Sequence, residues 1–173
     1  MTFKKPLCAV MAIFMLLTLT ACKSGKLDKL TIKLNGVTVK SPLTVEKLGD
    51  DYSVFFGVVA YKDDLIAFAV FDEDATESDD RKKKIKMLTS FNVDSIDAPT
   101  GLSVNGFFTG YTKSQAQDMI GEPTEKVQSS DIMTNDPMEA WLYREDGAAE
   151  DDNYLVIWFD KYGKSWDIIV NLE

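Results

Sequence analysis

Histidine is absent from this 173-residue chain, and positive charge is scarce, with 19 Lys and Arg residues against 28 Asp and Glu residues. Without histidine, the chain has no Ser-His-Asp triad, no histidine-ligated zinc site and no side chain of ordinary pKa near neutrality. The net charge of −9 disfavours nucleic acid as a partner and free insertion into anionic lipid. Only carboxylates remain for catalysis, so we expect no enzyme activity and no cofactor.

The start of the chain has the pattern of an export signal. Lys4 and Lys5 precede residues 7–19, which are apolar except for Thr18 and are too short to span a bilayer. Leu19-Thr20-Ala21-Cys22 then resembles the lipobox of bacterial lipoproteins, in which the leader is cut before the cysteine and the thiol carries acyl chains such as palmitate. We therefore predict a signal peptide over 1–21 and lipidation of Cys22, with an ordinary secretory signal or an uncleaved anchor as the alternatives.

This prediction places the mature protein on a membrane, outside the cytoplasm. The lipid on Cys22 would hold it to the cell membrane or the outer membrane, and residues 22–29 would form a tether of at most about 27 Å. The other cysteine, Cys8, is lost with the leader, so no disulfide can form in an oxidising compartment. Apolar burial alone must then hold the fold together.

The first predicted unit covers residues 30–97. Asn35-Gly36 separates two runs of alternating apolar residues, which is the strongest short signal for a β-hairpin. Ser41-Pro42 predicts the start of a short helix that ends at Gly49. Strands are expected over 54–61, 65–71 and 84–93.

An acidic run over residues 72–80 lies between the last two of these strands. Its alternating oxygens suggest a calcium loop, but Glu77 stands where an EF-hand needs glycine and Lys83 stands where it needs a bidentate glutamate. A solvated loop is therefore favoured over a metal site.

The second predicted unit covers residues 98–173 and repeats the order of the first. Asn105-Gly106 lies 70 positions after Asn35-Gly36 and precedes a helix with a capping box at Thr112 and Gln115. Gly121 ends this helix, and strands are expected over 140–144, 154–159 and 165–172. The predicted fold is therefore α+β, with short helices on an antiparallel sheet and two degenerate repeats of a hairpin-helix-strands unit.

Residues 110–123 carry a family signature. The run Gly-Tyr-Thr-Lys-Ser-Gln-Ala-Gln-Asp-Met-Ile-Gly-Glu-Pro resembles the pattern Gly-Met-Thr-x-x-x-Val-x-x-x-Leu-Gly-x-Pro of the SmpA/OmlA-like lipoproteins and the related β-lactamase-inhibitor-protein-like fold. The resemblance covers residues 106–173 and implies a helix laid across an antiparallel sheet, duplicated in the inhibitor proteins. It names no partner, because members assist outer-membrane assembly, inhibit enzymes or have no known role.

The chain is rich in aromatic residues, of which Trp141 and Tyr143 are the candidate protein-binding residues because they bracket a strand position expected to be exposed. We therefore expect a membrane-anchored, non-catalytic binding module that presents a sheet face to a protein of the cell envelope. The alternative is a lipid-anchored binder of a small molecule or cell-wall fragment, which would require a concave pocket with converging polar groups.

Overall fold

The computed structural model describes residues 29–62, 64–72, 81–90, 101–131, 134–145, 147, 149 and 153–173. The predicted signal peptide, Cys22 and nearly all of the tether lie outside these residues, as do most of the acidic run and the boundary between the two predicted units.

Strands dominate the described residues. In chain order they are β1 (Ile32–Leu34), β2 (Val37–Thr38), β3 (Leu43–Thr44), β4 (Tyr52–Phe55), β5 (Val58–Tyr61), β6 (Asp64–Phe71), β7 (Lys84–Ser90), β8 (Leu102–Val104), β9 (Glu125–Ser130), β10 (Pro137–Arg144), β11 (Asn153–Phe159) and β12 (Ser165–Asn171). The helices are α2 (Val45–Leu48) and α3 (Lys113–Met119). The fold is thus mainly β, and the predicted α+β class is right only in its antiparallel sheet and its short helices.

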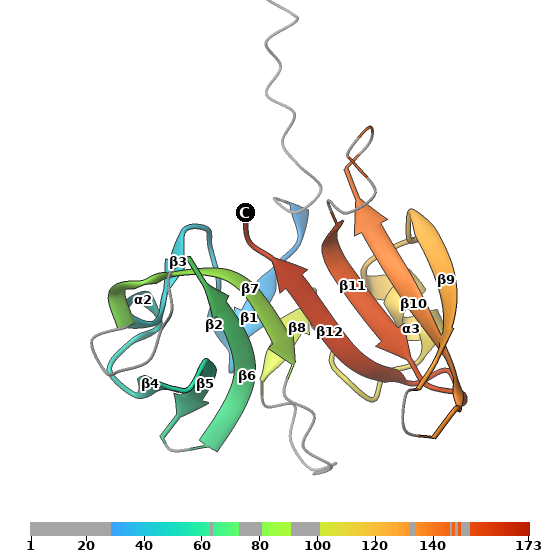
Figure 1. Ribbon diagram of the computed structural model, residues 1–173. Helices are drawn as coiled ribbons and strands as arrows, with labels where there is room; N and C mark the ends of the chain where they lie inside the picture. Colours follow the sequence, from blue (N-terminus) through green and yellow to red (C-terminus); the bar gives the residue numbers. More distant parts are fainter. Residues whose placement is uncertain are drawn as a thin grey trace, which may run out of the picture.

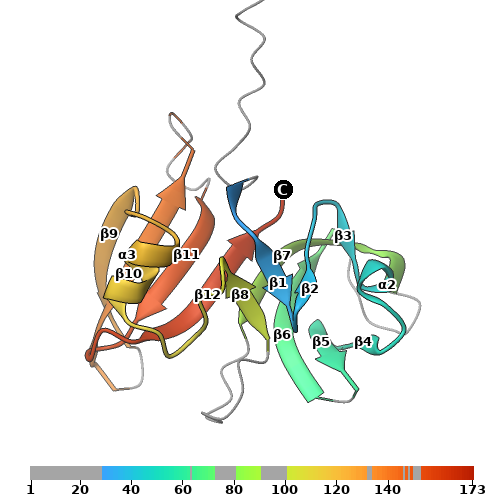
Figure 2. The same ribbon diagram turned by 180° about the vertical axis from the view of Figure 1, so that it is seen from behind.

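These strands form two antiparallel sheets. The small sheet has the order β2-β1-β8, and the large sheet has the order β4-β5-β6-β7-β12-β11-β10-β9, with β3 also paired to β7. Figure 1 shows the large sheet with the small sheet and α3 behind it, and Figure 2 shows those elements in front. One face of the large sheet is therefore covered by the small sheet and the helices, and the other face is open among the described residues.

The core lies between the large sheet and the layer that covers it. Buried residues come from the small sheet (Leu34 and Val104), from α2 (Val45 and Leu48) and from α3 (Ala116). Alternate residues of the large sheet complete this core, including Leu88, Ile157 and Val170. Burial of one side of each strand is the pattern of a sheet with a single covered face.

Both predicted Asn-Gly hairpin turns are confirmed. Asn35 and Gly36 have φ values of 47° and 82°, and Asn105 and Gly106 have φ values of 52° and 81°. The predicted strand over 54–61 is wrong, because a third two-residue turn of this kind, Phe56-Gly57, divides it into β4 and β5. This turn was not predicted from the sequence, because phenylalanine seldom adopts positive φ.

Both helices end where predicted, and α3 also begins where predicted. In α3, the Thr112 hydroxyl accepts from the backbone amide of Gln115, and the side-chain oxygen of Gln115 accepts from the backbone amide of Thr112. The capping box is therefore confirmed. In α2, Val45 and Leu48 are buried and Gly49 ends the helix, as predicted. This helix begins later than predicted, because Thr44 and not Ser41 is its N-terminal cap.

The strand order of the large sheet is symmetric about its centre. Four strands from the first half of the chain, β4 to β7, meet four from the second half, β9 to β12, at the central pair of β7 and β12. In the small sheet, Lys33 lies opposite Ser103, 70 positions later. The Asn35 backbone amide donates to the Gly101 carbonyl (2.9 Å), and the Asn105 backbone amide donates to the Thr31 carbonyl (2.8 Å). Residues 35 and 105 are 70 positions apart, and so are residues 31 and 101, so the two hydrogen bonds are equivalent contacts with the halves exchanged.

Candidate functional site

Trp141 and Tyr143 lie in the core, so their expected exposure is wrong. Both residues lie on β10, and each of these two side chains is only 3 % exposed. The Trp141 ring packs against Phe159 with a centroid distance of 4.9 Å, and the Tyr143 hydroxyl donates to the carbonyl of Gly121, just past α3. Burial also raises the pKa of the Tyr143 hydroxyl. The prediction assigned the two faces of β10 the wrong way round. Residues 140 and 142 lie on the open face, and residues 141 and 143 lie on the covered face.

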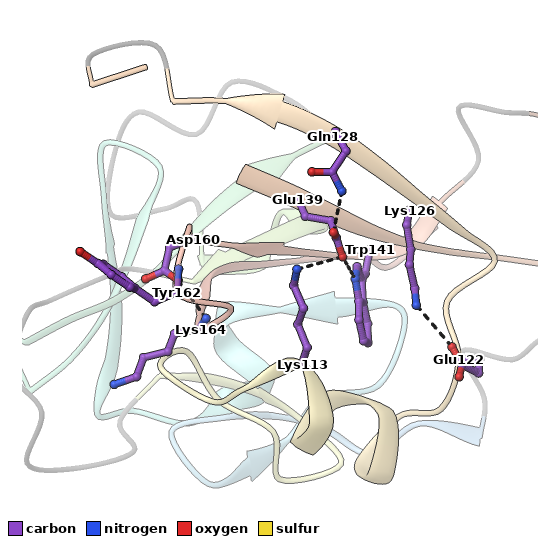
Figure 3. Close-up of polar contacts among 9 residues, drawn as sticks. All are labelled: Lys113, Glu122, Lys126, Gln128, Glu139, Trp141, Asp160, Tyr162 and Lys164. Carbon is purple, nitrogen blue, oxygen red and sulfur yellow. Dashed lines mark hydrogen bonds and ion pairs between the residues drawn. The ribbon is translucent and has the colours of Figure 1, made fainter. Parts of the chain in front are cut away.

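A polar cluster surrounds Glu139 at the edge of this core (Figure 3). Its carboxylate accepts from the Trp141 indole (2.5 Å) and the Gln128 amide (2.6 Å), and it pairs with the Lys113 ammonium (3.1 Å). Burial acts to raise the pKa of Glu139, but these three donors lower it more, so the net shift is downward. Because three donors keep this carboxylate ionised, it is a poor general acid, and it instead connects neighbouring elements. It links the N-terminus of α3 to β9 and β10.

Asp167 is a second carboxylate with a shifted pKa, and its shift has the opposite sign. It lies on β12, where it accepts from the Ser90 hydroxyl (2.5 Å) and from the Ile168 amide (2.8 Å). Burial raises its pKa, although these hydrogen bonds favour the charged form. Because Ser90 ends β7, this contact joins the two halves of the large sheet.

Among the residues with described positions, neither carboxylate belongs to a recognisable catalytic or metal-binding group. Glu139 and Asp167 bond to separate sets of partners on different strands. Over the residues that the structure describes, no group of three or more Asp, Glu, His or Cys residues is placed to hold a metal ion.

The open face of the large sheet carries a row of mainly apolar side chains. The strand register places one residue from each of eight strands side by side, namely Phe55, Val58, Phe68, Thr89, Ile169, Val156, Leu142 and Glu125. Residues directly opposite on neighbouring strands share a face, so this row crosses the whole sheet. We call it the open-face row.

A second set of apolar residues borders this row. Val70 lies opposite Met87, and Trp158, Ala140 and Val127 lie opposite one another across β11, β10 and β9. Val156 and Trp158 lie on the open face, whereas Ile168 pairs with Ile157 on the core side.

Exposure along the open face is uneven. Phe55 is 65 % exposed, and Phe68 and Val70 are each 47 % exposed, all in the first half of the chain. In the second half of the chain, Val156 and Trp158 are half-buried, Val127 is 38 % exposed and Ala140 is buried. The most exposed apolar surface of the open face therefore lies on β4 and β6.

One sequence signal could have revealed this face. In β6 the residues that point to the core are Ala67 and Ala69, whereas the larger Phe68 and Val70 point to the open face. A strand in which large apolar residues alternate with alanine has apolar residues on both faces, which is typical of strands that are covered on both faces.

A separate aromatic group lies at the turn between β11 and β12. Tyr162 is 76 % exposed and Trp166 is 50 % exposed. The Asp160 carboxylate shapes this turn by accepting from the amides of Tyr162 (2.8 Å) and Lys164 (2.9 Å), as Figure 3 shows. The Lys161 ammonium lies 5.3 Å from the centroid of the Tyr162 ring.

No described helix is long and apolar enough to cross a membrane. In comparisons with known proteins, no family model, no curated protein and no solved structure matches this chain.

Proposed function

We propose that this protein is a bacterial lipoprotein, anchored through Cys22 and facing outside the cytoplasm, that holds a protein of the cell envelope on the open face of its large sheet. The observation that carries the proposal is the open-face row, which continues across eight strands. A sheet with apolar residues on both faces usually has both faces covered, so the open face is suited to a partner.

The anchor rests on the first 22 residues. The charge of Lys4 and Lys5, the apolar run over 7–19 and the lipobox-like Leu19-Thr20-Ala21-Cys22 form one consistent export and lipidation signal. Either the cell membrane or the outer membrane would be the destination, and Lys23 after the cysteine permits sorting to the outer membrane in a cell with two membranes.

A binding role without catalysis agrees with the chemistry of the chain. Histidine is absent, and the carboxylates of Glu139 and Asp167 are each engaged by several donors. The apolar character of the open-face row favours a protein over a small molecule or cell-wall fragment, because small-molecule sites are concave and have converging polar groups.

The same proposal includes the kinship and the duplication. A helix with the capping box of the signature, laid on an antiparallel sheet, supports kinship with the SmpA/OmlA-like lipoproteins and the inhibitor-protein-like fold. The palindromic strand order and the exchanged contacts of Asn35 and Asn105 support two degenerate repeats. An experimental structure in which the halves superpose by a half-turn would bear this out, and any other rotation would contradict it.

The anchor is tested with Cys22→Ser. This variant should keep its leader and lose its lipid, because the thiol is both the lipidation point and the condition for cleavage. Metabolic labelling with a palmitate analogue and fractionation of the cells measure the two effects together. Label on the variant would show that Cys22 is not the anchor.

The binding face is tested with Val70→Lys, since Val70 is half exposed on the open face. Chemical cross-linking on intact cells should give partner adducts with the wild type and few with the variant. Thr38→Lys adds the same single positive charge at an exposed residue of the small sheet and is the control. Equal adducts for the two variants would argue against the open face.

A further inference from the structure

Three tight hairpin turns within the described residues have the same backbone shape but different residues. The first residue of each turn has a φ between 47° and 52°, and the second is a glycine with a φ between 77° and 82°. Two of the turns have asparagine in the first position, Asn35 and Asn105, which suits this conformation. The third has Phe56 there.

Phenylalanine is costly at this position for two reasons. A bulky side chain at positive φ is an outlier that persists only where the surroundings impose it. Phe56 also leaves 76 % of its side chain exposed, and the neighbouring Phe55 leaves 65 % exposed. Folding alone would favour asparagine, so the residue breaks a local rule without a gain within the described fold.

The hairpin that carries the two rings is fixed to the large sheet, and the rings contact each other. Their centroids lie 4.6 Å apart with an edge-to-face angle of 83°. Phe55 lies opposite Val58, which lies opposite Phe68, and the Ala69 amide donates to the Gly57 carbonyl at 2.8 Å. A pair of aromatic rings on a fixed hairpin loses little conformational freedom on binding.

We infer that Phe55 and Phe56 form an aromatic anchor that inserts into an apolar cleft of the protein partner, and that basic side chains rim this cleft. The inference deepens the proposed function and rests on it. Rigid aromatic side chains at the centre of an interface supply most of the binding energy in many complexes.

Charge argues for a protein cleft over a lipid surface. Aromatic residues that enter a membrane interface are usually accompanied by Lys and Arg. Four cation–ring contacts are found over the described part of the chain, at Tyr61, Phe159, Trp141 and Tyr162, and none involves the anchor.

The charge of the whole molecule is negative as well. The net charge is −9, whereas the two carboxylates that directly precede β4, Asp50 and Asp51, lie within ion-pair distance of Arg81 (3.6 Å) and Lys62 (3.8 Å) and so add no net charge of their own beside the anchor. Complementary charge steers partners together, so the rim of the cleft should be basic. Figure 1 also places the hairpin of β4 and β5 away from the start of β1, from which the chain runs back toward Cys22.

The first test introduces a photo-cross-linking amino acid at position 56 of the full-length lipoprotein on intact cells. The same amino acid at position 162 is the control, because Tyr162 has the same exposed fraction of 76 %. We expect position 56 alone to cross-link to a protein, at a peptide that lines an apolar cleft with Lys or Arg at its rim. Adducts to lipid, adducts to a second copy of this chain, or the same adducts from both positions would overturn the inference.

The second test measures the affinity of the purified lipoprotein for the partner identified in this way. Phe56→Asn should weaken binding by about thirtyfold or more, whereas Tyr162→Asn should leave the affinity within about twofold. The urea midpoint of Phe56→Asn should equal or exceed that of the wild type, because asparagine suits the turn. A lower midpoint with unchanged affinity would make Phe56 a structural residue.

The two proposals fail in different ways. If Val70→Lys abolishes partner adducts while Phe56→Asn binds like the wild type, the open face is the binding site and the anchor is wrong. If neither variant changes binding, the proposed function is wrong as well.

Discussion

Two carboxylates in this protein show how the surroundings of a single residue set its charge. Glu139 has three donors directed at its oxygens, and its pKa falls. Asp167 accepts hydrogen bonds too, but burial outweighs them and its pKa rises. A lowered pKa means that ionisation stabilises the folded state, and a raised pKa means that ionisation destabilises it.

Asp167→Asn is therefore expected to stabilise the protein at neutral pH. The amide oxygen can still accept from the Ser90 hydroxyl and the Ile168 amide, while the cost of a partly buried charge is removed. The wild type should lose stability relative to the variant as pH rises from the ordinary aspartate pKa of about 3.9 through the raised folded value. Urea unfolding over this pH range measures the difference, and a variant that is less stable at neutral pH would refute the argument.

Glu139→Gln should act in the opposite direction. The charged carboxylate stabilises the folded state above the ordinary glutamate pKa of about 4.3, and this contribution is lost as pH falls through the lowered folded value. The variant should thus be less stable than the wild type at neutral pH and approach it in acid. Glu46→Gln, on the exposed side of α2, controls for the change in net charge. A constant gap at all pH values would assign the effect to packing.

At the scale of elements, α3 depends on its ends because it has only seven residues. A helix this short is marginal alone, so its cap and its packed face supply its stability. Thr112→Ala should lower the free energy of unfolding by about 1 kcal/mol. Gly121→Val should lower it further, because Gly121 has a φ of 104° that a β-branched residue tolerates poorly.

Urea midpoints of these two variants give the measurement, with Ser114→Ala as the matched control. Ser114 is exposed within α3 and makes no part of the capping box, so its removal should change stability by less than about 0.5 kcal/mol. Three equal shifts would mean that neither end of the helix is special.

At the scale of the whole molecule, the two predicted units should unfold together. They share both sheets, through the pairing of β1 with β8 and of β7 with β12. Trp141, Trp158 and Trp166 all lie in the second half, so tryptophan fluorescence reports that half and far-UV circular dichroism reports both. The two signals should give one urea midpoint. Separate midpoints would show that residues 30–97 and 98–173 are independent domains.

Features that depend on neighbouring residues could be predicted from the sequence. The turns at Asn35-Gly36 and Asn105-Gly106 were predictable, and so were the capping box of α3 and its end at Gly121. Each of these follows from the φ preference or the hydrogen-bonding groups of two to four adjacent residues. The export signal and the lipidation of Cys22 stay predictions, and they too depend only on adjacent residues.

Only the tertiary structure decided which side of each strand faces the core. A strand alternates with a period of two, and β6 and β10 have apolar residues on both faces, so the pattern alone is ambiguous. The covering by the small sheet and α3 placed Trp141 and Tyr143 inside and left Phe68 outside. Likewise, β9 has six exposed residues and no apolar alternation, and it is a strand because β10 pairs with it. Local preference determined the turns at Asn35 and Asn105, and contacts between distant segments determined which side of each strand is buried.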